Sequence, residues 1–152
     1  MVKPHKGTYA LLLSSRVDSP IRIGRLGNLR LRPGFYVYIG SAHGPGGLRA
    51  RLGHHLKLTS RPHWHLDYLR AHANPEEAWY CYDPRPWEHT WAKCIATQRG
   101  ASIPLAGFGA SDCGCESHLF FFANRPSRIA FVRSLRKIDP MHPLVQLDRL
   151  KP

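Results

Sequence analysis

One carboxylate lies where a helix is expected to be apolar. The helix is expected over residues 84–99, and on a 3.6-residue wheel Glu88 falls among Trp91, Ala92 and Ile95. A carboxylate on an apolar face costs free energy unless a cation or a buried arginine pairs with it. Glu88 is therefore a candidate ligand for a divalent cation. The alternatives are a plain salt bridge, or an exposed first-turn glutamate that the helix dipole favours.

Arg51 and His55 lie four residues apart, at the edge of a stripe of leucines on the helix expected over residues 48–58. From there Arg51 could face a groove beside a sheet. A guanidinium in such a groove would stabilise the negative charge of a phosphorane-like transition state. The alternative is a solvated surface arginine.

Two tyrosines are expected to meet on one face of the sheet. Alternation along the strand expected over residues 35–40 puts Tyr38 and Gly40 on the same face, and Tyr9 lies on the neighbouring strand. Paired phenols could hold a water molecule or accept its proton near a metal ion. The alternative is aromatic packing in the core.

The elements that position these residues follow from periodicity and turn signals. The predicted strands are 7–14, 21–24, 29–31, 35–40, 78–82 and 117–123, and the predicted helices are 48–58, 62–73, 84–99 and 128–138. This pattern indicates an α/β (α+β) fold with a small central, mostly antiparallel sheet flanked by helices. We expect a single domain over residues 1–152, with a core at about 5–124 and a basic extension at 125–152.

The charge balance favours a polyanionic partner. Among 152 residues, 22 Lys and Arg outnumber 10 Asp and Glu, which gives a net charge of +12. Nucleic acid is the expected partner, since arginine forks match phosphate oxygens in pairs. The chain has no apolar run of about 20 residues, so we expect no membrane span. Residues 1–6 are too polar to begin a secretion signal, and we expect a cytoplasmic protein.

A short segment carries potential zinc ligands. Its D-C-x-C-x-x-H pattern consists of Asp112, Cys113, Cys115 and His118. The C-x-C spacing is tighter than in most zinc sites, and a further ligand would have to come from elsewhere, such as Cys81 or His63. The favoured alternative is that the cysteines pack as small apolar side chains while Asp112 and His118 fix the loop by hydrogen bonds.

These residues carry a family resemblance. Gly7-Thr8-Tyr9 followed by Tyr38-Ile39-Gly40 resembles the two motifs that name the GIY-YIG endonucleases. The resemblance continues through Ser41-Ala42, Arg51, His55, residues 63–68 and Glu88. Residues 107–115 and 117–120, GFGASDCGC and SHLF, look like the signature of one uncharacterised branch of that superfamily.

The resemblance implies a metal-dependent DNA endonuclease. By position, Glu88 would bind one Mg²⁺ or Mn²⁺, and Tyr9 would act as or assist the general base. Tyr38 would support that site, Arg51 would stabilise the transition state, and His55 would lie close to the scissile phosphate. This combination of metal, base and cation suits phosphodiester hydrolysis.

We further expect Ser41, Arg49, Lys57 and His65 to contact DNA, and Asp67 to pair with a nearby arginine. The rival hypotheses are a nucleic-acid-binding module without catalysis and a zinc-binding interaction domain. A lone nuclease domain suggests weakly specific or structure-dependent cutting, or targeting by a protein partner. The sequence does not predict the oligomeric state.

The sequence departs from the resemblance in two places. Thr8 replaces the usual isoleucine, but it is β-branched and suits a strand. Tyr38 follows Tyr9 only after 29 positions, and residues 15–33 are expected to be an inserted hairpin. If this insertion shifted the strand register by one residue, one tyrosine would turn to the opposite face.

Overall fold

A five-stranded sheet forms the centre of the protein. The computed structural model describes residues 1–110 and 114–150. Within them the strand order is β6-β4-β1-β5-β7, and each neighbouring pair is antiparallel. The strands are β1 (Gly7–Ser15), β4 (Gly34–Ala42), β5 (Asn74–Tyr82), β6 (Leu119–Phe122) and β7 (Gln146–Arg149). The predicted α+β fold with an antiparallel sheet is confirmed.

The insertion forms its own small sheet and leaves the main register intact. Among the strands that the structure describes, β2 (Ser19–Ile23) and β3 (Gly27–Leu31) pair with each other and with no other strand. In the β1–β4 ladder, Tyr9 lies opposite Gly40 and Leu11 lies opposite Tyr38. Residues directly opposite each other project from the same face of a sheet, so Tyr9 and Tyr38 share a face, as predicted.

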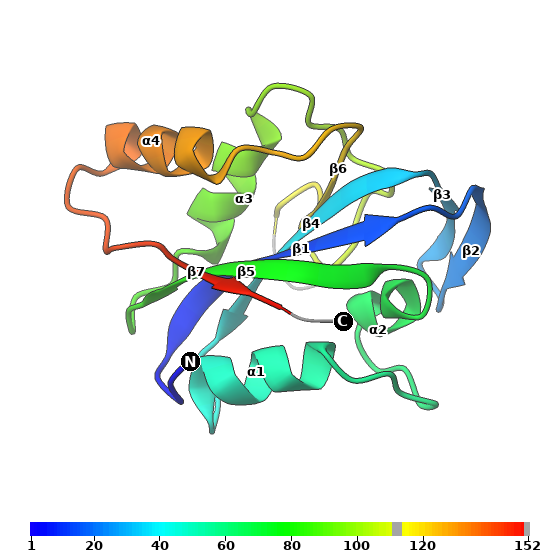
Figure 1. Ribbon diagram of the computed structural model, residues 1–152, viewed down its shortest axis with the longest axis horizontal. Helices are drawn as coiled ribbons and strands as arrows, with labels where there is room; N and C mark the ends of the chain where they lie inside the picture. Colours follow the sequence, from blue (N-terminus) through cyan, green and yellow to red (C-terminus); the bar gives the residue numbers. More distant parts are fainter. Residues whose placement is uncertain (111–113, 151–152) are drawn as a thin grey trace.

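Helices cover both faces of the sheet (Figure 1). One face carries Tyr9, Leu11 and Leu13 and packs with leucines of α1 (Gly47–His55) and α2 (His65–Arg70). The other face carries Ala10 and Leu12 and packs with α3 (Glu88–Ala96) and α4 (Arg128–Ile138). Both faces of β1 are therefore buried, and close packing on each face restricts the orientation of its side chains.

Three helices are shorter than the sequence predicts. Helix α1 ends at His55 instead of residue 58, and Leu56, the third leucine of the predicted stripe, is 37% exposed, unlike the buried Leu48 and Leu52. Helix α2 begins at His65 instead of residue 62, because the Asp67 carboxylate accepts from the backbone N–H groups of His63 and Trp64. Helix α3 begins at Glu88 instead of residue 84, because Asp83 holds the preceding turn by accepting from the Arg85 backbone N–H.

The C-terminal segment joins the same body. The predicted helix over residues 128–138 is confirmed as α4, and the unpredicted strand β7 pairs with β5 at the sheet edge. Among the described helices, none has the length and apolar composition needed to span a membrane.

Candidate functional site

Tyr9 and His55 form a buried hydrogen-bonded pair between β1 and α1. The Tyr9 hydroxyl oxygen lies 2.6 Å from Nε2 of His55, and neither residue is more than 2% exposed. Burial lowers the pKa of His55 to about 3, so the imidazole is neutral near pH 7. Burial also raises the pKa of Tyr9 well above its ordinary value, so the phenol keeps its proton. A neutral imidazole in this position can accept that proton.

Tyr38 borders this pair. Its ring centroid lies 6.3 Å from that of Tyr9 and 5.9 Å from that of His55, and its other side meets Phe108 edge to face. Burial raises the pKa of Tyr38, and the negative charge of Glu88 raises it further. The Tyr38 hydroxyl therefore keeps its proton, and the Tyr38 ring packs beside the rings of Tyr9 and His55.

Arg51 is a positioned cation next to the same pair. Its Nη1 donates to the Ser41 carbonyl over 2.9 Å, and its guanidinium carbon lies 4.6 Å from the centre of the Trp64 ring. Burial has the largest effect on the pKa of Tyr9 and raises it. The Arg51 guanidinium acts in the opposite direction, through its charge and a hydrogen bond, but does not outweigh burial. Arg51, His54 and Trp64 line a hollow of about 210 Å³, together with residues of the 42–50 segment. A phosphate group in this hollow would meet the guanidinium directly.

Glu88 lies at the start of α3 and contacts His118. Its Oε2 atom is 2.6 Å from Nδ1 of His118, and the Glu88 side chain stays 21% exposed. Burial acts to raise the pKa of Glu88, but hydrogen bonds with His118 and the Ser41 side chain outweigh it and lower the pKa. The carboxylate is therefore ionised and partly open to solvent. The sequence did not predict its contact with His118.

Ser41 connects the two halves of the site. Its carbonyl accepts from Arg51 of α1, and its side chain is hydrogen-bonded to Glu88 of α3. Residues 39–42 of β4 extend past the segment that pairs with β6, which ends at Tyr38. Four predicted catalytic residues from β1, β4 and α1 thus gather on one side of this strand end, and Glu88 approaches it from α3.

The remaining predicted DNA contacts are more dispersed. Arg49 and Lys57 are exposed, and Arg49 donates to the carbonyl of Val2. His65 turns toward the loop before β6, where its Nδ1 accepts from the Gly109 N–H over 2.8 Å. The predicted arginine partner of Asp67 is wrong: the carboxylate pairs with His54 at 3.0 Å.

A potential metal-binding group lies beside Glu88. One ligand atom each of His89, Cys115 and His118 lies within 4.8 Å of the others. Two residues of the predicted zinc pattern, Asp112 and Cys113, lie outside the described residues. Cys81 belongs to the apolar cluster under α3. The sequence did not indicate His89 as a ligand, although His89 follows Glu88 directly in the chain.

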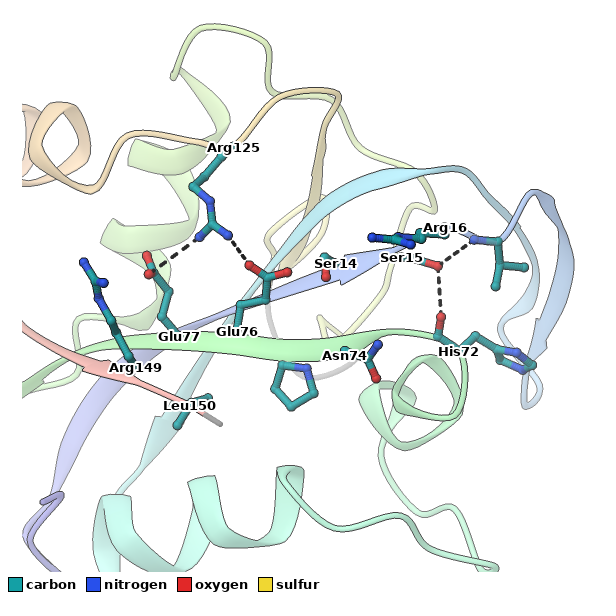
Figure 2. A pocket seen from close by; sticks show the side chains of 12 residues that line it. Ser14, Ser15, Arg16, His72, Asn74, Glu76, Glu77, Arg125, Arg149 and Leu150 are labelled. Carbon is teal, nitrogen blue, oxygen red and sulfur yellow. Dashed lines mark hydrogen bonds and ion pairs between the residues drawn. The ribbon is translucent and has the colours of Figure 1, made fainter. Parts of the chain in front are cut away.

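A wider hollow lies at the other end of β1 and β5. Its volume is about 890 Å³, and Figure 2 shows Arg125 between Glu76 and Glu77 at its margin. Because these carboxylates pair with the guanidinium, Arg125 is not available as an isolated cation for an anionic ligand. The predicted catalytic residues do not line this hollow.

Comparison with known proteins identifies the family of the chain without naming an activity. No curated protein and no solved structure matches it significantly. Residues 8–138 match the domain of unknown function DUF123, and the chain belongs to that family.

Proposed function

We propose that this protein is a metal-dependent DNA endonuclease of the GIY-YIG type. The proposal rests above all on the 2.6 Å contact between Tyr9 and His55 beside the Arg51 guanidinium. A proton-accepting pair beside a fixed cation that itself lines an open hollow suits the hydrolysis of a phosphodiester.

In the proposed mechanism, Tyr9 and His55 act together on the attacking water. The water proton passes to the Tyr9 oxygen while the phenol proton passes to Nε2 of His55. A neutral imidazole is needed for this step, and His55 is neutral because burial lowers its pKa to about 3. A bound phosphate would raise the basicity of His55, because its negative charge favours the imidazolium.

Arg51 binds the scissile phosphate in this scheme. The charge on the phosphoryl oxygens grows as the water attacks, and a guanidinium already held by Ser41 and Trp64 needs little reorganisation to stabilise it. Tyr38 excludes bulk water from the far side of Tyr9.

Glu88 suits one hard divalent cation. It is ionised and partly exposed, and Mg²⁺ is commonly bound through one or two carboxylates, several waters and substrate phosphates. When bound, Mg²⁺ or Mn²⁺ would act as a Lewis acid at the phosphate. Ser41 and His118 orient the carboxylate that would hold it.

DNA is the proposed substrate, and the cytoplasm is the proposed location of the protein. The net charge of +12 attracts a polyanion, and exposed Arg49, Lys57 and Arg61 lie on or just after α1. A protein partner that selects the cleavage site is compatible with the small size of the chain.

Cleavage of supercoiled plasmid tests the proposal. The purified protein should nick the plasmid with Mg²⁺ or Mn²⁺, and Arg51→Ala should lower the rate by about 10²-fold or more. Parallel assays on duplexes, flaps and junctions would define the substrate. Binding without cleavage of every DNA and with both metals would favour a non-catalytic binding module.

A further inference from the structure

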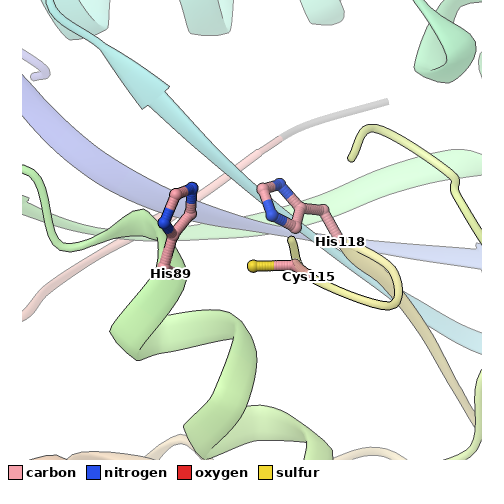
Figure 3. Close-up of side chains that lie close together, drawn as sticks. All are labelled: His89, Cys115 and His118. Carbon is pink, nitrogen blue, oxygen red and sulfur yellow. The ribbon is translucent and has the colours of Figure 1, made fainter. Parts of the chain in front are cut away.

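Three side chains with soft or borderline metal-ligand atoms converge beside Glu88. His89 comes from the first turn of α3, whereas Cys115 and His118 come from the segment before β6 (Figure 3). Their ligand atoms lie within 4.8 Å of one another. His118 is 1% exposed, Cys115 is half-buried and His89 is exposed. The group therefore extends from the interior to the surface.

We propose that His89, Cys115 and His118 bind a Zn²⁺ ion. Two imidazoles and a thiolate are ligands that zinc prefers, whereas Mg²⁺ and Ca²⁺ select oxygen. Three protein ligands leave a fourth tetrahedral position for water. A small movement of side chains would bring atoms that already lie within 4.8 Å to bonding distance, at about 2.0–2.3 Å from a common ion.

Glu88 supplies the second feature expected of such a site. A metal-bound histidine usually donates its other ring N–H to a carboxylate, which fixes the tautomer and the ring orientation. Nδ1 of His118 lies 2.6 Å from Oε2 of Glu88. We therefore assign Nε2 of His118 to the zinc ion, and Glu88 orients the ring from the opposite side.

The zinc ion would tie the segment before β6 to the first turn of α3. His89 follows Glu88 directly, and His118 precedes β6, so the ion links the two elements that hold the Glu88 carboxylate. The proposed effect of the ion is to hold these two elements together, with water at its fourth position. The Mg²⁺ proposed for hydrolysis is a separate ion on the carboxylate oxygens, and the zinc site holds whether or not the chain is a nuclease.

Metal analysis of the tag-free protein tests the zinc site without any DNA. Protein expressed with zinc and desalted should contain equimolar zinc by plasma mass spectrometry. The variants Cys115→Ser and His89→Ala should each lose most of it. Cys94→Ala and His72→Ala are matched controls, and both variants should keep the zinc. Cys94 is buried in the apolar cluster that contains residues of α3 and α4, and His72 is an exposed histidine outside the proposed metal-binding group.

Cobalt provides an independent readout. Protein stripped of zinc and loaded with Co²⁺ should show a thiolate-to-cobalt charge-transfer band that disappears in Cys115→Ser but not in Cys94→Ala. The zinc site is wrong if the purified protein binds neither zinc nor cobalt, if the equimolar metal that Cys115→Ser loses is not zinc, or if Cys115→Ser retains full zinc. A nuclease defect alone leaves these measurements unchanged.

Discussion

The phenol of Tyr9 lies directly over Gly40, its partner in the β1–β4 ladder. A Cβ atom at position 40 would stand 2.3 Å from the Tyr9 hydroxyl oxygen and 2.5 Å from Cζ. The third position of the second motif thus needs a glycine because the tyrosine of the first motif crosses it. A larger residue at position 40 is therefore incompatible with the present position of the Tyr9 ring.

Gly40→Ala should therefore damage the site without unfolding the protein. The phenol must move by about 1 Å and lose its contact with His55, and such a displacement typically costs about 10²-fold in rate. Gly53→Ala is the control, because a Cβ there meets nothing within 4 Å, and it should stabilise α1 by about 0.5–1 kcal/mol. Equal plasmid-cleavage rates for the two folded variants would contradict the role of Tyr9.

Tyr9→Phe removes only the hydroxyl group. We expect cleavage to fall by about 10²–10⁴-fold, as for loss of a general base. Tyr36→Phe is a matched control on the same face of the sheet, because its hydroxyl accepts from the Arg32 N–H instead of contacting His55. Both Tyr36→Phe and Tyr9→Phe should lower the free energy of unfolding in urea by about 1 kcal/mol. Tyr36→Phe should nevertheless cleave at the wild-type rate. A Tyr9→Phe protein that cleaves as fast as Tyr36→Phe would exclude the proposed relay.

Much of this arrangement could be predicted from local pattern. Alternation placed Tyr38 and Gly40 on one face, and the segment 15–33 pairs within itself, so the register that joins Tyr9 to them is preserved. Helical spacing put Arg51 and His55 on neighbouring turns. These are relationships within one element or between adjacent strands, where periodicity determines direction.

Contacts between distant elements could not be predicted in the same way. Nothing in the sequence pairs His118 with Glu88 or brings His89 to Cys115, because these contacts depend on how α3 packs against the loop before β6. Strand β7 has the sequence QLDR and lacks an apolar pattern, since it is a short edge strand. Helix α1 ends where the leucines that follow become exposed, and α2 begins where Asp67 caps its first turn. Helical periodicity alone predicts neither boundary.

His55 should make stability sensitive to acid. Burial lowers its folded-state pKa to about 3, whereas the unfolded value is 6.5, so between these pH values the unfolded chain binds a proton that the folded protein does not. Stability therefore falls as the pH drops through this window, by at most about 1.4 kcal/mol per pH unit from this group. Urea unfolding between pH 6.5 and 4.5 should show a shallower decline for His55→Gln than for the wild type. Parallel declines would show that His55 is charged in the folded protein.

Asp67 should stabilise the start of α2. Its carboxylate accepts from the backbone N–H groups of His63 and Trp64 and contacts His54, so Asp67→Ala should cost about 1–2 kcal/mol. Asp67→Asn keeps an acceptor oxygen and should cost less. Asp18→Ala breaks the exposed pair with Arg30 and should change stability by less than about 1 kcal/mol. Urea unfolding would contradict this role if Asp67→Ala and Asp18→Ala were equally stable.

The most direct measurement compares cleavage and DNA binding in Glu88→Gln. This change keeps the size of the side chain but removes the ionised carboxylate proposed to hold Mg²⁺ or Mn²⁺. Plasmid nicking should fall to background, while the affinity for the same DNA should stay equal or rise, because a negative charge near the phosphate has been removed. A Glu88→Gln protein that nicks plasmid at the wild-type rate would contradict metal-dependent hydrolysis at this site.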